Sequence, residues 1–102
     1  MIARGEVWLA RLGPGARGEV ACVVVSPAEL HDHLGIALVA PLSTGHRPAG
    51  YRVDVNFEGR PGRILLEQVT AIDQTQLLRS LGSVSHKTLA ASLAVLREMF
   101  AE

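Results

Sequence analysis

Two hydroxyls, an imidazole and a guanidinium follow one another where an apolar run ends. Ser43, Thr44, His46 and Arg47 come directly after Leu38–Leu42. Polar groups at the end of a rigid strand are well placed to bind a ligand or to move a proton. A solvated hairpin tip would use the same residue types as turn formers. The segment is therefore a candidate site, with a plain turn as the alternative.

Metal ligation is the first chemistry to consider, because the chain has four histidines. His31 and His33 are two apart on an expected helix, so their side chains diverge. With Asp32 they give His-Asp-His, but no matching ligand pair follows at a characteristic spacing. We therefore predict neither a metal site nor a cofactor, and expect these histidines on the surface of the helix.

Two further chemistries are excluded by local sequence. Ser43 is not within a Gly-x-Ser-x-Gly motif, so it does not resemble the nucleophile of a serine hydrolase. The Gly-rich segment 13–18 is followed by an expected strand, so no helix N-terminus is offered to a phosphate.

RNA cleavage that uses the 2′-hydroxyl of the substrate needs no metal. It needs a base, a proton donor for the leaving oxygen and donors to the phosphorane. Ser43 and Thr44, a guanidinium from Arg17 or Arg47 and the carboxylate of Glu19 could supply these groups. The residue types make this chemistry possible without specifying it.

Composition limits the remaining classes. The chain has 102 residues, of which 48% are apolar, and ten cations balance ten anions. We expect one domain over residues 1–102, and any binding of a polyanion must use a local basic patch. The single cysteine, Cys22, excludes an internal disulfide and is expected in the core. No signal peptide or membrane span is recognisable, so the cytoplasm is the expected location.

The expected elements are five or six short strands and two helices. Strands are predicted over Glu6–Leu12, Glu19–Val25, Ile36–Leu42, Tyr51–Phe57, Arg63–Val69 and about Leu78–Val84. Helices are predicted over Ala28–Leu34 and about His86–Ala101. Short strands joined by tight turns, with one terminal helix, predict a mainly β fold, a small and strongly curved antiparallel barrel.

Several local details follow from the same patterns. Ser26 is predicted to cap the first helix, with Pro27 at its first position, and Ser85 to cap the second. Residues 59–62 are predicted to form the turn before the fifth strand. Leu89, Leu93, Leu96 and Phe100 are predicted to form the apolar stripe with which the terminal helix packs on the sheet.

The order of several short motifs resembles the MazF/PemK toxin family over nearly the whole chain. Each motif is weak alone, and their order and spacing carry the resemblance. They are Arg4–Leu9, Val23–Pro27 with Glu29–Leu34, Val39–Gly45 with Gly50–Tyr51, Leu65–Val69 with Ile72–Asp73, and Leu81–Ser85 with the helix after it.

The resemblance implies an SH3-like barrel that forms a homodimer through its sheet. It also implies a metal-independent endoribonuclease that cuts single-stranded RNA at short sequences and leaves a 2′,3′-cyclic phosphate. The expected RNA is messenger RNA, with transfer or ribosomal RNA as alternatives. Such toxins stop translation and growth until a cognate antitoxin places an extended tail in the RNA groove.

The functional residues of the family match this sequence unevenly. The catalytic hydroxyl falls on Ser43, where the family usually has threonine, and Thr44 matches the next position. Glu67 and Gln68 match an acidic-Gln pair. The family usually has an Arg-Pro dipeptide before the second apolar strand, and this chain has Val20-Ala21 there. The main catalytic cation of the family is therefore missing from its usual position.

Three interpretations of this departure stay open. Arg17 could replace the missing cation from the shortened loop, or His46 or Arg47 could supply the proton chemistry from the opposite loop. Alternatively, the protein could be catalytically weak or inactive while keeping the surface that binds an antitoxin. Catalysis is thus assigned to Ser43, Thr44 and Arg17, and substrate binding to Glu19, His46, Arg47, Glu67 and Gln68.

A function from another class also remains. Gyrase poisons of the CcdB type resemble this barrel and engage their target with residues of the terminal helix. Phe100 is the aromatic residue available for that role here. Its position in the expected apolar stripe argues for a role in packing instead.

Overall fold

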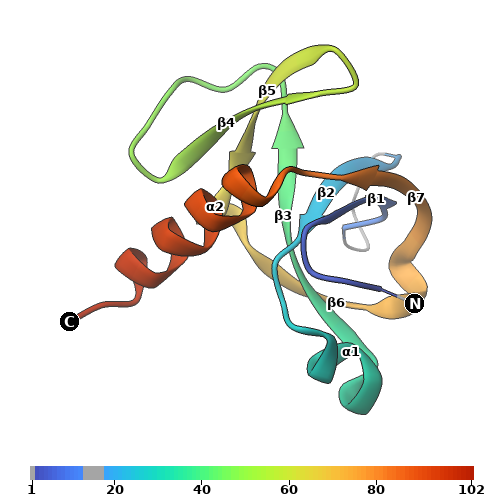
Figure 1. Ribbon diagram of the computed structural model, residues 1–102. Coiled ribbons are helices and arrows are strands. Elements are labelled where there is room, and N and C mark those ends of the chain that lie inside the picture. Colours follow the sequence, from blue (N-terminus) through green and yellow to red (C-terminus); the bar gives the residue numbers. More distant parts are fainter. Residues whose placement is uncertain (1, 13–17) are drawn as a thin grey trace.

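A strongly curled antiparallel sheet forms the body of the protein (Figure 1). The computed structural model describes residues 2–12 and 18–102. Within them the strands are β1 (Glu6–Ala10), β2 (Val20–Val24), β3 (Ile36–Ser43), β4 (Arg52–Phe57), β5 (Arg60–Leu65), β6 (Thr70–Asp73) and β7 (Leu77–Ser83). Their order is β4-β5-β3-β2-β1-β7, with β6 paired to β3. This half-barrel confirms the predicted mainly β fold.

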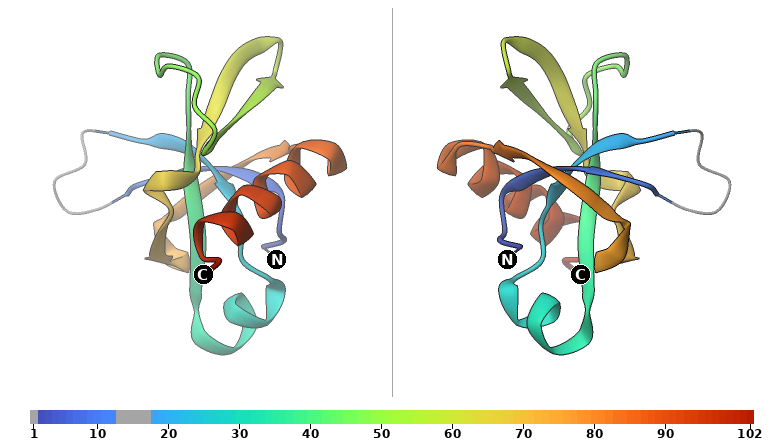
Figure 2. Two further views of the ribbon diagram at one scale, coloured as in Figure 1. Left: turned by 90° about the vertical axis from the view of Figure 1, so that its left-hand side faces the viewer. Right: turned by 90° about the vertical axis from the view of Figure 1, so that its right-hand side faces the viewer.

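The central strand β3 sets the position of the candidate site. It pairs with β6 over Ile36–Val39, with β2 over Val39–Pro41 and with β5 through Leu42 and Ser43. Its middle is fully buried at Val39 and Ala40, which explains the apolar run. Ser43 is the last residue of this strand, at the end where the β4–β5 hairpin projects from the body (Figures 1 and 2).

The turn of the β4–β5 hairpin lies earlier in the sequence than predicted. Phe57 pairs with Arg60, so the turn is Glu58-Gly59 and the expected turn residues 60–62 belong to β5. Glu58 and Gly59 have φ values of 52° and 77°, as a two-residue turn compatible with strand twist requires. Pro61 is accommodated because β3 pairs with β5 only from Arg63 onward.

The predicted fifth strand was also too long. After β5, a 3₁₀ turn, η1 (Leu66–Gln68), redirects the chain, and β6 then pairs with the first half of β3. A second 3₁₀ turn, η2 (Gln74–Gln76), leads into β7, and the Asp73 side chain caps it. The apolar pattern of residues 63–69 was read correctly, but the chain bends at η1. Because of this bend, β5 pairs with the end of β3 and β6 pairs with its beginning.

Helix α1 (Ala28–Leu34) corrects two predictions. Its N-cap is Pro27, without a side-chain cap, whereas Ser26 is buried. The Ser26 hydroxyl accepts from the Leu38 N–H and lies 2.7 Å from His31 Nε2. His31 is only 3% exposed, and its Nδ1 lies 2.9 Å from the Ile2 carbonyl oxygen. His31 therefore joins the N-terminal segment to the core, while His33 is exposed as predicted.

Helix α2 (His86–Met99) packs on the sheet with only part of the predicted stripe. The Ser85 side chain accepts from the Thr88 N–H, which confirms it as the N-cap. Leu93 and Leu96 pack against the core, but Phe100 is 76% exposed. Phe100 follows the last helical residue at the end farthest from Ser85 (Figure 1), so helical spacing overestimated its contact with the sheet.

The predicted core position of Cys22 is confirmed. Its side chain is fully buried in a core cluster that includes Ala10 and Val24. Its Sγ lies 3.4 Å from the Trp8 carbonyl oxygen. Burial raises the pKa of this thiol to about 12, because a thiolate would lose its hydration. None of the helices in the described part of the chain is long and apolar enough to cross a membrane.

Candidate functional site

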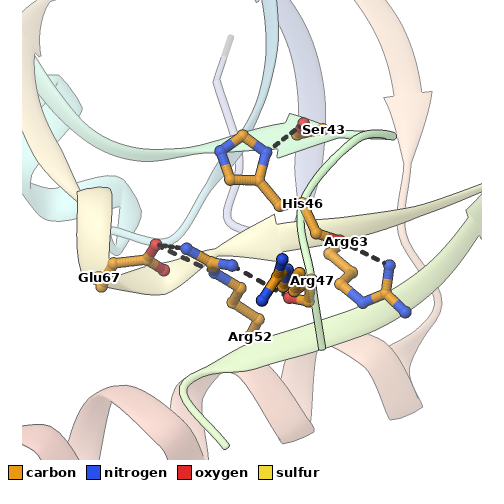
Figure 3. A network of polar contacts seen from close by, with 6 residues as sticks. All are labelled: Ser43, His46, Arg47, Arg52, Arg63 and Glu67. Carbon is orange, nitrogen blue, oxygen red and sulfur yellow. Dashed lines mark hydrogen bonds and ion pairs between the residues drawn. The ribbon is translucent and has the colours of Figure 1, made fainter. Parts of the chain in front are cut away.

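The centre of the candidate site is a hydrogen bond between Ser43 and His46. Ser43 Oγ lies 2.7 Å from His46 Nδ1 and accepts from the Gly45 N–H at 3.3 Å. The buried strand β3 fixes Ser43, and the chain turns back so that the exposed imidazole faces the hydroxyl (Figure 3). A hydroxyl on an imidazole nitrogen is an arrangement through which a proton can move.

Two arginines from the neighbouring hairpin hold the loop that carries His46. Arg63 Nη1 donates to the His46 carbonyl oxygen at 2.9 Å, and Arg52 Nη1 donates to the Arg47 carbonyl oxygen at 3.0 Å (Figure 3). Sequence reasoning missed both arginines. In β4, Arg52 and Asp54 alternate with valines, which placed Arg52 on a polar face of that strand. Only the pairing of β4 and β5 with their neighbours shows that Arg52 and Arg63 support this loop.

Arg52 also forms an ion pair with Glu67. Its Nε and Nη2 both donate to Glu67 Oε2, at 3.0 and 2.6 Å. This contact lowers the pKa of the Glu67 carboxyl and raises that of the Arg52 guanidinium, because each hydrogen bond favours the charged form. Among the other causes, an electrostatic contribution from His46 is the smallest and also lowers the Glu67 pKa. Glu67 Oε1 is buried and has no hydrogen-bond partner within the described residues.

Thr44 stands between two hollows on either side of the projecting hairpin. The first, of about 430 Å³, has an apolar floor that includes Leu42 and Phe57. The second, of about 420 Å³, is bordered by Arg63 and Asp54. Thr44 lines both hollows. Thr44 can therefore contact a ligand on either side of the hairpin.

The structure brings some of the predicted residues together and leaves others at the margin. Ser43, His46 and Glu67 gather around one loop, and Arg47 contributes its carbonyl while its side chain is exposed. Gln68 is exposed at the end of η1, and Glu19 is exposed just before β2. Arg17 lies outside the described residues.

Val20, where the resemblance places the family's cation, is the first residue of β2, and β2 pairs with β3. The last pair toward this end is Cys22 with Pro41, so Val20, at the start of β2, lies toward the end of β3 that carries Ser43. On the other side of β3, Ser43 pairs with Arg63. An arginine is therefore the cross-strand partner of Ser43, but on β5 instead of β2, and its guanidinium contacts the His46 carbonyl oxygen.

Metal ligation finds no support in the same geometry. Residues 2–12 and 18–102 contain no group of three or more His, Cys, Asp or Glu side chains placed to hold an ion. Both ring nitrogens of His31 face protein partners inside the fold, so this histidine offers no free ligand atom.

Gly62 permits the close approach of β5 to the candidate site. A Cβ built there would lie 3.0 Å from the Ser43 carbonyl oxygen, which is main chain and cannot rotate away. Gly62→Ala is therefore expected to displace the end of β3 by a few tenths of an ångström. We expect it to lower the free energy of unfolding by about 1 kcal/mol, measured by urea denaturation.

Gly50→Ala is the matched control for this substitution, because open space surrounds Gly50 and its φ is not positive. It is expected to change the stability by less than about 0.5 kcal/mol. Equal effects of the two alanines would show that the Ser43 contact is not tight.

Comparisons with known proteins agree with this fold. A family model described as PemK-like, MazF-like toxin of type II toxin-antitoxin system matches residues 3–100. A mycobacterial endoribonuclease solved with its cognate antitoxin is 20% identical, with a TM-score of 0.84, and the match covers 96% of this chain and 93% of that one. No curated protein matches the sequence.

Two further solved structures are similar. The Mycobacterium tuberculosis toxin MazF-mt6 is 19% identical over 93% of this chain and 95% of that chain, with a TM-score of 0.78. A MazE-MazF structure from Deinococcus radiodurans is 20% identical over 98% and 95%, with a TM-score of 0.80. At these identities the likeness concerns the fold.

Proposed function

Because this chain belongs to the PemK-like, MazF-like toxin family of type II toxin-antitoxin systems, we propose that it is a toxin that cleaves single-stranded RNA without a metal ion. The observation that carries the proposal is the hydrogen bond between Ser43 and His46 at the end of β3. The solved relatives named as endoribonucleases make RNA the substrate to test first.

In the proposed reaction, the substrate 2′-oxygen attacks the adjacent phosphorus while the bond from phosphorus to the 5′-oxygen breaks. Neutral His46 takes the proton of the 2′-hydroxyl, and the leaving 5′-oxygen takes a proton from solvent. The Ser43 hydroxyl donates to a non-bridging oxygen of the phosphorane, where negative charge develops. The products are a 2′,3′-cyclic phosphate and a 5′-hydroxyl end.

Three residues are candidates to replace the missing family arginine: Arg17 as a cation, or His46 or Arg47 as the source of the proton chemistry. His46 is favoured by its contact with Ser43, whereas Arg47 is connected to the site through its carbonyl. Arg17 stays a candidate from the Gly-rich segment. Thr44, Glu19 and Gln68 are proposed to contact the RNA, because their side chains are exposed.

The proposed partners are RNA, a cognate antitoxin and a second copy of the chain. The net charge is zero, so attraction of RNA must come from locally gathered cations. Arg47, Arg52 and Arg63 lie around the loop (Figure 3), where Glu67 pairs with Arg52 and Asp54 with Arg63, so the exposed Arg47 is the cation proposed to attract RNA. A relative solved with its cognate antitoxin supports the proposed antitoxin partner, and dimerisation is proposed from the family resemblance.

One observation favours the CcdB-like alternative more than the sequence did. Phe100 was expected in the core, but its exposure leaves an aromatic side chain free at the end of the terminal helix. Gyrase-dependent DNA breakage with intact RNA would support that function. Tight antitoxin binding without growth arrest would instead indicate a degenerate toxin.

The direct experiment incubates the purified protein with a long RNA and EDTA and maps the new ends. Cleavage at a few defined sequences, with cyclic phosphate on the upstream fragment, is the expected result. Cleavage that requires added magnesium would contradict the mechanism. A preparation that leaves every RNA intact would contradict the activity itself.

A further inference from the structure

Arg63 occupies the middle of a row of three paired residues that crosses the candidate site. It pairs with Ser43 on β3 and with Asp54 on β4. Side chains of directly paired residues in an antiparallel sheet lie on the same face. The Arg63 side chain is therefore held between the two neighbouring strands and is only 25% exposed.

The guanidinium of Arg63 contacts both an acid and the candidate loop. Nε lies 3.0 Å from Asp54 Oδ1, as an ion pair without the alignment of a hydrogen bond. Nη1 donates to the His46 carbonyl oxygen at 2.9 Å (Figure 3). The Asp54 carboxylate attracts one side of the guanidinium while the other side holds the loop.

His46 is consequently held twice, by two residues that are paired with each other. Its imidazole contacts Ser43, and its main chain contacts Arg63, the cross-strand partner of Ser43. His46 lies in an exposed segment without strand pairing, where an imidazole would otherwise sample several orientations. Arg52 supports the same loop one residue later, but Arg63 holds the residue that carries the imidazole.

We infer that Arg63 is the positioning residue of this site: it fixes the main chain of His46 so that the imidazole stays on the Ser43 hydroxyl. The inference rests on the proposed function for its catalytic meaning. It differs from a phosphate-binding role, in which the guanidinium would attract the RNA and leave His46 unaffected.

The two roles predict different kinetics. Loss of a positioning residue lowers kcat, because the acid–base group is misplaced in the transition state, and leaves KM nearly unchanged. Loss of a phosphate contact raises KM and lowers the salt dependence of binding by about one unit of slope.

The test compares Arg63→Met, Arg63→Lys and Asp54→Asn with the control Arg79→Met, which removes an exposed arginine from β7 at the other end of the sheet. The first readout is the ¹H–¹⁵N NMR spectrum of the His46 ring in the free protein. The second is kcat and KM on a short RNA that contains one cleavage site.

We expect Arg63→Met to remove the signature of the hydrogen-bonded Nδ1 and to lower kcat roughly 10- to 100-fold with KM within about twofold. Arg63→Lys can still donate to the carbonyl, so it should retain part of the signature and of the rate. The NMR signature and kcat of Asp54→Asn should lie between those of Arg63→Lys and wild type. Arg79→Met should match wild type in both readouts.

An unchanged His46 spectrum in Arg63→Met would overturn the inference, as would a raised KM with unchanged kcat. If wild type leaves RNA intact while Arg63→Met still frees the imidazole, the proposed function fails but the Arg63 tether of His46 stands. Failure of the two claims can therefore be told apart.

Discussion

Ser43→Ala is expected to slow RNA cleavage about 100-fold, because the hydroxyl is both the partner of His46 and a donor to the phosphorane. His46→Ala should cost a similar factor. The two residues act through one hydrogen bond, so the double variant should be little slower than either single variant. Single-turnover cleavage of a short RNA under EDTA gives the three rates.

Ser43→Thr is the matched control, since it keeps the hydroxyl and adds the methyl group that the family usually carries. It should retain most of the activity. If Ser43→Ala cuts RNA as fast as Ser43→Thr, then the hydroxyl has no part in the reaction. Additive losses in the double variant would show that Ser43 and His46 act separately.

Arg52→Met is expected to lower the cleavage rate at least tenfold, because the loop loses its support at the Arg47 carbonyl and Glu67 loses its counter-ion. It should also change how stability depends on pH. Arg52 holds the pKa of Glu67 below its ordinary value of 4.5. The ion pair therefore stabilises the folded protein above about pH 4.5, and this contribution is lost as the pH falls through the lowered pKa.

The stability difference between wild type and Arg52→Met should accordingly be largest near pH 7 and should shrink toward pH 3. Urea denaturation at both pH values measures it. Arg79→Met serves again as the control and should show no such dependence. A difference that is equal at pH 7 and pH 3 would mean that the Arg52–Glu67 pair contributes nothing to folding.

Local patterns predicted the elements that depend on local physics. The alternation of valines in β4 and the Ser85 cap of α2 were both correct, because neighbouring residues determine them. The turn at Glu58-Gly59 was misplaced, since Pro61 and Gly62 in β5 are stronger turn formers than Glu58. Here strand register, with Phe57 opposite Arg60, outweighs local propensity.

Long-range contacts explain the errors in burial. His31 was expected on the surface, but Ser26 and the Ile2 carbonyl satisfy its ring inside the fold. Neither partner is recognisable from the seven residues of α1. Phe100 was expected in the core because helical spacing continues past Leu96, but the helix ends at Met99 and leaves Phe100 76% exposed.

The candidate site was found from the sequence only in outline. A polar segment after an apolar run located Ser43 and His46 correctly at a strand end. The roles of Arg52 and Arg63 depend on pairing among β3, β4 and β5, which no periodicity shows. Because the family's arginine is missing at Val20, the sequence indicated a site without that cation. In the structure, Ser43 pairs with Arg63 on the other neighbouring strand, β5.

The most direct test of RNA cleavage through the 2′-hydroxyl uses one RNA made in two forms. One carries the natural ribose at the mapped cleavage site, and the other carries a single 2′-deoxyribose there. Under EDTA, wild-type protein should cut the first and leave a 2′,3′-cyclic phosphate, while the second stays intact. Cleavage of the deoxy form at the same bond would contradict the proposed mechanism.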